Sequence, residues 1–100
     1  MSTGQLISKL VRDYKPEKVV LFGSRTRSDY NESSDYDLLV IKSGVNMSNR
    51  HQENIKIRRM FPANISVDTV VYSPNDFNAR LKMGDPFLIN VANTGEVLYG

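Results

Sequence analysis

The sequence contains no cysteine and only one histidine, His51, among its 100 residues. The absence of cysteine excludes disulfides and thiolate metal sites, and a single histidine cannot build a zinc site alone. No apolar run approaches the roughly 20 residues of a membrane span, and the N-terminus lacks the apolar core of a signal peptide. We therefore expect a cytoplasmic protein that makes no membrane contact.

The sequence also has little excess of charge of either sign, because 13 basic residues are nearly balanced by 11 acidic ones, for a formal net charge of +2. So small an excess does not indicate a nucleic-acid binder, and we expect no direct nucleic-acid binding. The length suits one small domain, predicted to span residues 1–100, and a hydrophobic content of 40% is enough for a core. A domain of this size is marginally stable alone, so assembly into a homo-oligomer or hetero-oligomer would help it.

Hydrophobic spacing and capping residues divide the chain into helices and strands. Helices are predicted over residues 4–14, with Ser2 or Thr3 as the cap, and over about 48–60, with Ser48 as the cap. Two more are predicted from the Ser73-Pro74 pair onward and between the Asp85-Pro86 and Thr94-Gly95 pairs. Apolar runs predict strands at residues 18–22, 35–41 and 65–72, and residues 96–99 form a short strand or tail. The predicted fold class is α/β, of the α+β type. Its sheet is mixed and largely antiparallel, with helices packed on one face and an acidic site exposed on the other.

The turn after the first strand has the composition of an anion site. Gly23 can take unusual backbone dihedrals, and the hydroxyl of Ser24 can cap a short helical turn. The free N–H groups of such a turn bind phosphate, and Arg25 and Arg27 can add charge-assisted hydrogen bonds. Phosphate binding by Gly23, Ser24, Arg25 and Arg27 is the prediction for this turn.

Two carboxylates follow at the start of the second strand. Because strand side chains alternate, Asp35 and Asp37 point to the same face. Carboxylates this close repel unless a cation lies between them, and Mg²⁺ is usually held by one or two carboxylates together with substrate phosphates. A phosphate turn beside such a pair describes a nucleoside triphosphate site, which requires the first two strands to run antiparallel.

The motif of Gly23-Ser24, ten residues, and then Asp35-Tyr36-Asp37 resembles the signature of the nucleotidyltransferases of the DNA polymerase β superfamily. The match covers most of the chain, whose length resembles that of the stand-alone minimal nucleotidyltransferases. The family has a third carboxylate on a later strand, and Asp68 stands where it is expected. The resemblance implies the polymerase-β-like nucleotidyltransferase fold.

The resemblance also implies an activity: Mg²⁺-dependent transfer of AMP from ATP to a hydroxyl. Asp35 and Asp37 would bridge two Mg²⁺ ions, Asp68 would complete the ion that activates the attacking hydroxyl, and Gly23 and Ser24 would hold the outer phosphates. All three aspartates are therefore predicted to be both catalytic residues and metal ligands. The chain departs from the family around Arg27, where Thr26 and Ser28 replace the usual small residue and glycine.

Many minimal nucleotidyltransferases are encoded beside a HEPN-domain protein as a toxin and antitoxin pair, which implies a HEPN toxin as partner and acceptor. Larger members carry an additional helical domain for the acceptor, so here we expect another molecule to supply that surface. Two alternatives stay open. One is an adenylyltransferase for a small molecule such as an aminoglycoside, within a homodimer. The other is a binding module that neutralises its partner by occlusion without chemistry.

Residues 50–59 form the most basic segment of the chain, with Arg50, Lys56, Arg58 and Arg59. We interpret it as a solvated helix with a few apolar anchors, and the alternative is a basic surface for a nucleotide, RNA or an acidic partner. His51, in the same segment, is interpreted as solvated.

Overall fold

The sheet has four strands in the order β3-β2-β1-β4 in the computed structural model, which describes residues 2–23 and 35–100. The strands are β1 (Lys18–Phe22), β2 (Tyr36–Ile41), β3 (Val67–Tyr72) and β4 (Glu96–Tyr99). Strand β1 pairs antiparallel with both β2 and β4, whereas β2 and β3 run parallel. The mixed, largely antiparallel sheet predicted from the sequence is confirmed, and so is the antiparallel pairing of the first two strands.

Helices α1 (Thr3–Tyr14), α2 (Arg50–Arg59), α3 (Pro74–Lys82) and α4 (Pro86–Thr94) accompany the sheet. Three of them begin at capping residues that the sequence predicted, namely Ser2, Ser73 and Asp85. Helix α2 instead begins after Asn49, because Oδ1 of Asn46 accepts hydrogen bonds from the backbone N–H groups of Ser48 and Asn49. Ser48 therefore belongs to the preceding turn and does not cap the helix. In the described part of the chain, no helix combines the length and apolar composition that crossing a membrane requires.

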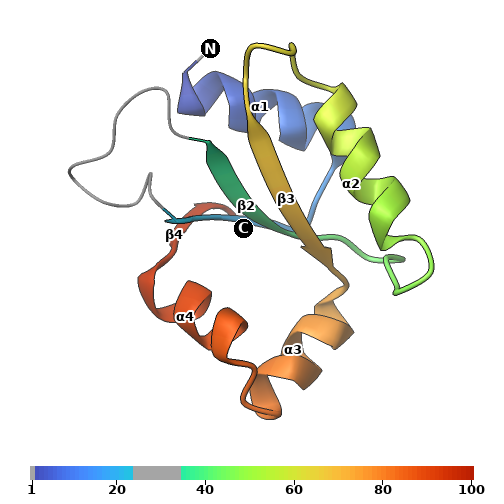
Figure 1. The fold of residues 1–100 in the computed structure, drawn as a ribbon, viewed down its shortest axis with the longest axis vertical. Helices are drawn as coiled ribbons and strands as arrows, with labels where there is room; N and C mark the ends of the chain where they lie inside the picture. The colour runs from blue at the N-terminus through green and yellow to red at the C-terminus, as the bar shows by residue number, and fades with distance from the viewer. Residues whose placement is uncertain (1, 24–34) are drawn as a thin grey trace.

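The two faces of the sheet bury separate apolar clusters. One face packs Leu38 and Val40 under α1 and α2, and the other packs Leu39 and Ile41 under α4. Helices α3 and α4 lie together, at the lower end of the molecule in Figure 1, away from α1 and α2. The sequence predicted helices on one face, and the structure adds this second pair. Burying a side chain such as Leu39 or Ile41 stabilises the fold by about 1.5–3 kcal/mol. This gain explains why a second pair of helices packs on this face of the sheet.

Candidate functional site

Two aspartates lie side by side on neighbouring strands. Asp37 of β2 and Asp68 of β3 are direct partners in the parallel register, and neighbouring strands are about 4.8 Å apart. Because side chains alternate along a strand, both aspartates point to the face on which Leu39 and Tyr72 pack in the cluster of α4. The two aspartates lie on this face beyond the apolar cluster. Asp68 is exposed there, and Asp37 is half-buried.

The electrostatics of Asp37 indicate a place for a cation. Burial raises the pKa of the Asp37 carboxyl above its ordinary value, and the negative charges of Asp68 and Asp35 raise it further. Asp35 directly precedes β2 and is exposed. Each of these causes disfavours the ionised form of Asp37, and a bound divalent cation would reverse the effect.

Gly23, at the end of β1, lies against the Asp37 carboxylate. Its neighbour Phe22 is the register partner of Asp37 in the antiparallel pair. Gly23 has a φ of +79°, and a Cβ atom placed on it would overlap Oδ2 of Asp37. Only glycine allows the backbone to turn here and approach the carboxylate so closely. The remaining predicted phosphate contacts, Ser24, Arg25 and Arg27, lie outside the described residues.

The site residues therefore form a row across the sheet. Gly23 follows β1, Asp37 is on the adjacent strand β2, and Asp68 is on β3 at the far side. The end of β1 and the beginnings of β2 and β3 meet at one end of the sheet because β1 runs opposite to both. A phosphate chain held after Gly23 would thus lie on one side of Asp37, with Asp68 on the other.

Arg58 of α2 forms an ion pair with Asp68 that the sequence did not predict. Its Nη2 atom lies 3.2 Å from Oδ1 of Asp68, and the two side chains are 71% and 55% exposed. Ion pairs this exposed contribute about 0–1 kcal/mol to stability, so a divalent metal ion can displace Arg58 from Asp68. The sequence does show which residues share one side of α2 with Arg58. Helical spacing places His51, Asn54 and Ile55 on that side.

The three aspartates offer suitable donors for Mg²⁺, since this ion prefers carboxylate oxygens. Within residues 2–23 and 35–100, no three histidine, aspartate or glutamate side chains lie close enough together to form a complete metal site. The residues fit a divalent cation whose binding would draw the carboxylates together.

The antiparallel pairing of β1 with β2 and the parallel pairing of β2 with β3 place Gly23, Asp37 and Asp68 on three consecutive strands at one end of the sheet. The model of the family described as "Polymerase beta, Nucleotidyltransferase" matches residues 5–100. The chain therefore belongs to the polymerase β nucleotidyltransferase family. This membership confirms the fold class and the enzyme class that were predicted from the sequence.

Two curated relatives come from Methanocaldococcus jannaschii. The one named "Putative protein adenylyltransferase MJ0141" is 35% identical over 68 residues, which cover 66% of this chain and 68% of the relative. The one named "Putative protein adenylyltransferase MJ0604" is 29% identical over 83 residues, which cover 83% of this chain and 78% of the relative.

Two solved structures share the fold. The structure of a protein described as a "putative nucleotidyltransferase" from Sulfolobus solfataricus superposes with a TM-score of 0.56 at 26% identity, covering 76% of this chain and 68% of that one. A structure of the toxin-antitoxin MntA-HpeT, carrying two aspartate-to-glutamate substitutions two positions apart, gives a TM-score of 0.58 at 21% identity. It covers 99% of this chain and 74% of that one, and at this identity the likeness concerns the fold alone.

Proposed function

We propose that this protein transfers AMP from ATP to a hydroxyl of a partner protein in a Mg²⁺-dependent reaction. The observation that carries the proposal is the row of Gly23, Asp37 and Asp68 across three strands. It combines a turn suited to phosphate with carboxylates suited to a divalent cation. The names of the two relatives from Methanocaldococcus jannaschii support a protein as the acceptor.

Each residue of the row has a proposed role. The turn that begins at Gly23 binds the outer phosphates of ATP through backbone N–H groups, with Ser24, Arg25 and Arg27 adding contacts. Asp35 and Asp37 would hold Mg²⁺ together with the phosphates, and the carboxylate of Asp68 would be a ligand of a second Mg²⁺ ion. When bound, the metal ions neutralise charge that develops on the phosphate oxygens during transfer.

The reaction follows from this order. The acceptor oxygen forms a bond to the α-phosphorus while the bond between that phosphorus and the bridging oxygen breaks, and pyrophosphate leaves with the electron pair. Attacking and leaving oxygens are roughly in line, so the acceptor arrives on the side opposite the outer phosphates. That side is the Asp68 side, where the carboxylate of Asp68 takes the proton of the hydroxyl. The remaining contribution of the chain is to position the two substrates.

The proposed partner is a HEPN-domain toxin, modified on a tyrosine hydroxyl. The shared fold with a toxin-antitoxin protein supports a toxin as the partner. An AMP ester near the catalytic residues of a ribonuclease would block RNA, because it adds charge of the same sign as the RNA backbone. The inactivation would then persist after the two proteins separate.

The experiment uses, as the candidate partner, the product of any HEPN reading frame encoded beside the gene for this protein. This product is incubated with the protein, ATP and Mg²⁺, separated from both, and then assayed alone for nuclease activity and by mass spectrometry. The proposal predicts lasting inactivation and an added mass of one or more AMP units. Full recovery of nuclease activity without added mass would contradict it and would indicate neutralisation by occlusion.

A further inference from the structure

A groove between α2 and the outer edge of β3 begins at Asp68. It is a hollow of about 230 Å³, lined by His51, Asn54, Ile55 and Arg58 of α2 and by residues 67–69 of β3. We propose that this groove, which we call the α2–β3 groove, is the docking surface for an extended, acidic segment of the acceptor protein. The inference rests on the proposed function, since it names the surface that presents the acceptor hydroxyl to the site.

Position is the first argument. In-line transfer requires the acceptor to approach from the side opposite the outer phosphates. The row from Gly23 through Asp37 to Asp68 fixes that side as the β3 edge. The α2–β3 groove has Asp68 in its lining, so a segment bound there brings a hydroxyl next to this carboxylate.

The open backbone of β3 is the second argument. This strand is at the edge of the sheet, and the carbonyl of Val71 points outward because it accepts a hydrogen bond of 2.8 Å from Nε of Arg50. Alternation along the strand turns the backbone groups of Val67 and Thr69 to the same outer edge. Arg50 covers the edge at Val71, and Oγ1 of Thr69 donates a hydrogen bond of 3.0 Å to Oδ1 of Asn54, while residues 67–69 line the groove. Unpaired edge groups of this kind bind extended segments by strand addition.

The third argument is the positive charge of α2, which favours an acidic segment. Helix α2 carries four basic residues and one acidic residue, Glu53, which pairs with Lys56 at 2.8 Å. Arg58 and Asp68 both line the groove, and Nη2 of Arg58 binds the Asp68 carboxylate at 3.2 Å. An acidic acceptor segment can take the place of Asp68 on Arg58, and this exchange frees Asp68 for the reaction. Arg58 is thus a positioning residue for the acceptor.

The test uses two synthetic peptides, each with one tyrosine, flanked by glutamates in one and by lysines in the other. Amide NMR shifts of the full-length protein follow each titration, with single-stranded oligouridylate as a third ligand. We expect the acidic peptide to shift residues 51–58 and 67–69 and to bind more tightly than the other two ligands. Preference for oligouridylate, or shifts elsewhere, would overturn the proposal and indicate a nucleic-acid surface or a different docking site.

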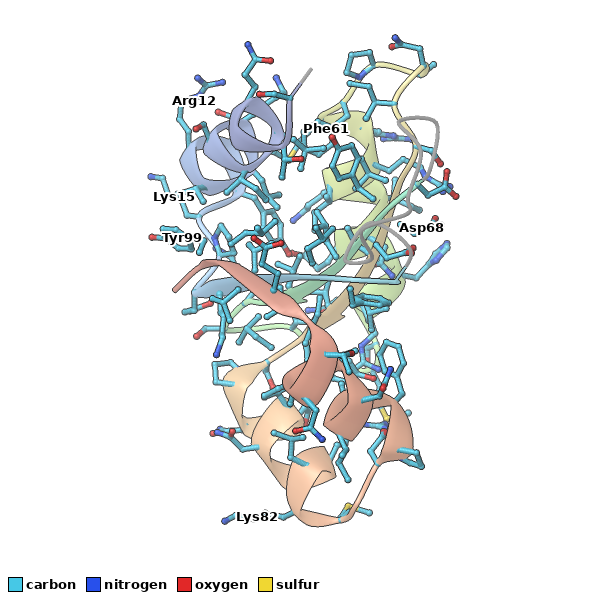
Figure 2. The ribbon with its side chains drawn as sticks, turned by 90° about the vertical axis from the view of Figure 1, so that its left-hand side faces the viewer. Arg12, Lys15, Phe61, Asp68, Lys82 and Tyr99 are labelled. Atoms are coloured by element: carbon cyan, nitrogen blue, oxygen red, sulfur yellow. The ribbon has the colours of Figure 1, made fainter. Side chains whose placement is uncertain are left out.

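Variants assign the binding to the groove. Arg58→Ala and His51→Glu should each weaken acidic-peptide binding about fivefold, corresponding to about 1 kcal/mol. Lys82→Ala is the matched control, because Lys82 is a cation at the end of the molecule remote from Asp68 in Figure 2. Equal weakening by all three variants would overturn the assignment to the groove. Both test positions are exposed, and thermal melting reports their folding.

Failure of the docking proposal is distinguishable from failure of the proposed function. Transfer of AMP to the acidic peptide in the presence of ATP and Mg²⁺ tests the function, whereas the NMR titration needs no transfer. Binding of the peptide in the groove without transfer of AMP would support the docking surface. The same result would count against a protein as the acceptor of AMP. Transfer with a KM for the peptide unchanged in Arg58→Ala would overturn the docking surface and keep the function.

Discussion

Gly23 and Asp37 approach each other so closely that a Cβ atom on Gly23 would overlap the Oδ2 atom of Asp37. The contact joins the end of β1 to the start of β2, which are partners in the antiparallel register. It links the predicted phosphate turn to the predicted metal ligands in a single structural unit. A change at Gly23 therefore tests the geometry of the whole site.

Gly23→Ala should reduce nucleotide transfer by more than tenfold, since the added methyl group displaces the Asp37 carboxylate. It should also cost about 1–2 kcal/mol of stability, because Gly23 has a positive φ. Gly44→Ala is the control: its φ is +89° and a Cβ there meets nothing within 4 Å. Comparable melting temperatures for the two variants, with transfer and Mn²⁺ affinity lost only in Gly23→Ala, would support this account. Full transfer by Gly23→Ala would refute it.

Asp37→Asn should abolish transfer and leave the fold intact. Without Mg²⁺ its melting temperature should hold or rise, because the substitution removes repulsion from Asp68 and Asp35. Excess Mg²⁺ should raise the melting temperature of the natural protein more than that of the variant. Asp35→Asn should behave in the same way. Near-normal transfer by either variant with Mg²⁺ would remove the proposed metal role.

Ser24→Ala should reduce transfer less than either aspartate change. The backbone donors of the turn remain, and one hydroxyl contact contributes about 0.5–1.5 kcal/mol, which is about tenfold at most. The comparison is a kinetic series of Ser24→Ala, Asp35→Asn and Asp37→Asn at one Mg²⁺ concentration. Complete inactivation by Ser24→Ala would show that its hydroxyl takes part in the chemistry itself.

Arg58→Ala should strengthen Mn²⁺ binding modestly, because Arg58 competes with the metal for Asp68. An exposed ion pair contributes at most about 1 kcal/mol, so the expected gain is about fivefold or less. Titration calorimetry of Arg58→Ala, Lys82→Ala and the natural protein measures it. The same substitution should weaken acidic-peptide binding, and a change of both affinities in one direction would count against the roles given to Arg58.

Tyr14 and Glu53 join α1 to α2 outside the site. The hydroxyl of Tyr14 donates to Oε1 of Glu53 at 2.7 Å, and a hydrogen bond to a charged group contributes about 1.5–3 kcal/mol. Tyr14→Phe should therefore lower the free energy of unfolding by about this amount while leaving metal affinity unchanged. Tyr99→Phe, at an exposed tyrosine, is the control.

The same pair gives a pH dependence of stability. Hydrogen bonds from Lys56 and then from Tyr14 hold the pKa of Glu53 below its ordinary value of 4.5. The stabilisation by Glu53 is fully present above this value and is lost as the pH falls through the lower pKa of the folded state. Urea unfolding of Tyr14→Phe should show a smaller loss of stability between about pH 5 and pH 3 than that of the natural protein. An identical loss in both proteins would contradict the proposed contribution of Tyr14.

The sequence predicted the parts of the site that depend on local pattern. Alternation along the second strand placed Asp35 and Asp37 on one face, and the family resemblance supplied Asp68 as the third carboxylate. The requirement that Gly23 and these aspartates serve one ligand predicted the antiparallel pairing of β1 and β2, which the structure confirms. The roles of these residues, and those of Ser24, Arg25 and Arg27, stay predictions. The interpretation of Ser48 as a helix cap was wrong because Asn46 organises that turn.

Features that depend on tertiary placement could not be predicted in the same way. Leu39 lies on the same face of the sheet as Asp37, so this face was predicted to be the exposed one, whereas α4 covers its apolar part. The basic composition of α2 was visible in the sequence, but the pairing of Arg58 with Asp68 depends on how α2 packs beside the edge strand β3. Periodicity defines the side of a helix and leaves open what that side contacts.

The most direct test of the central claim compares ATP labelled at the α-phosphate with ATP labelled at the γ-phosphate. Each is incubated with Mg²⁺, the neighbouring HEPN gene product and either the natural protein or Asp37→Asn. We predict that only the α-label is transferred to the HEPN protein, that transfer requires Mg²⁺, and that Asp37→Asn transfers none. Transfer of the γ-label, or equal α-labelling by Asp37→Asn, would contradict nucleotidyl transfer at the site of Gly23, Asp37 and Asp68.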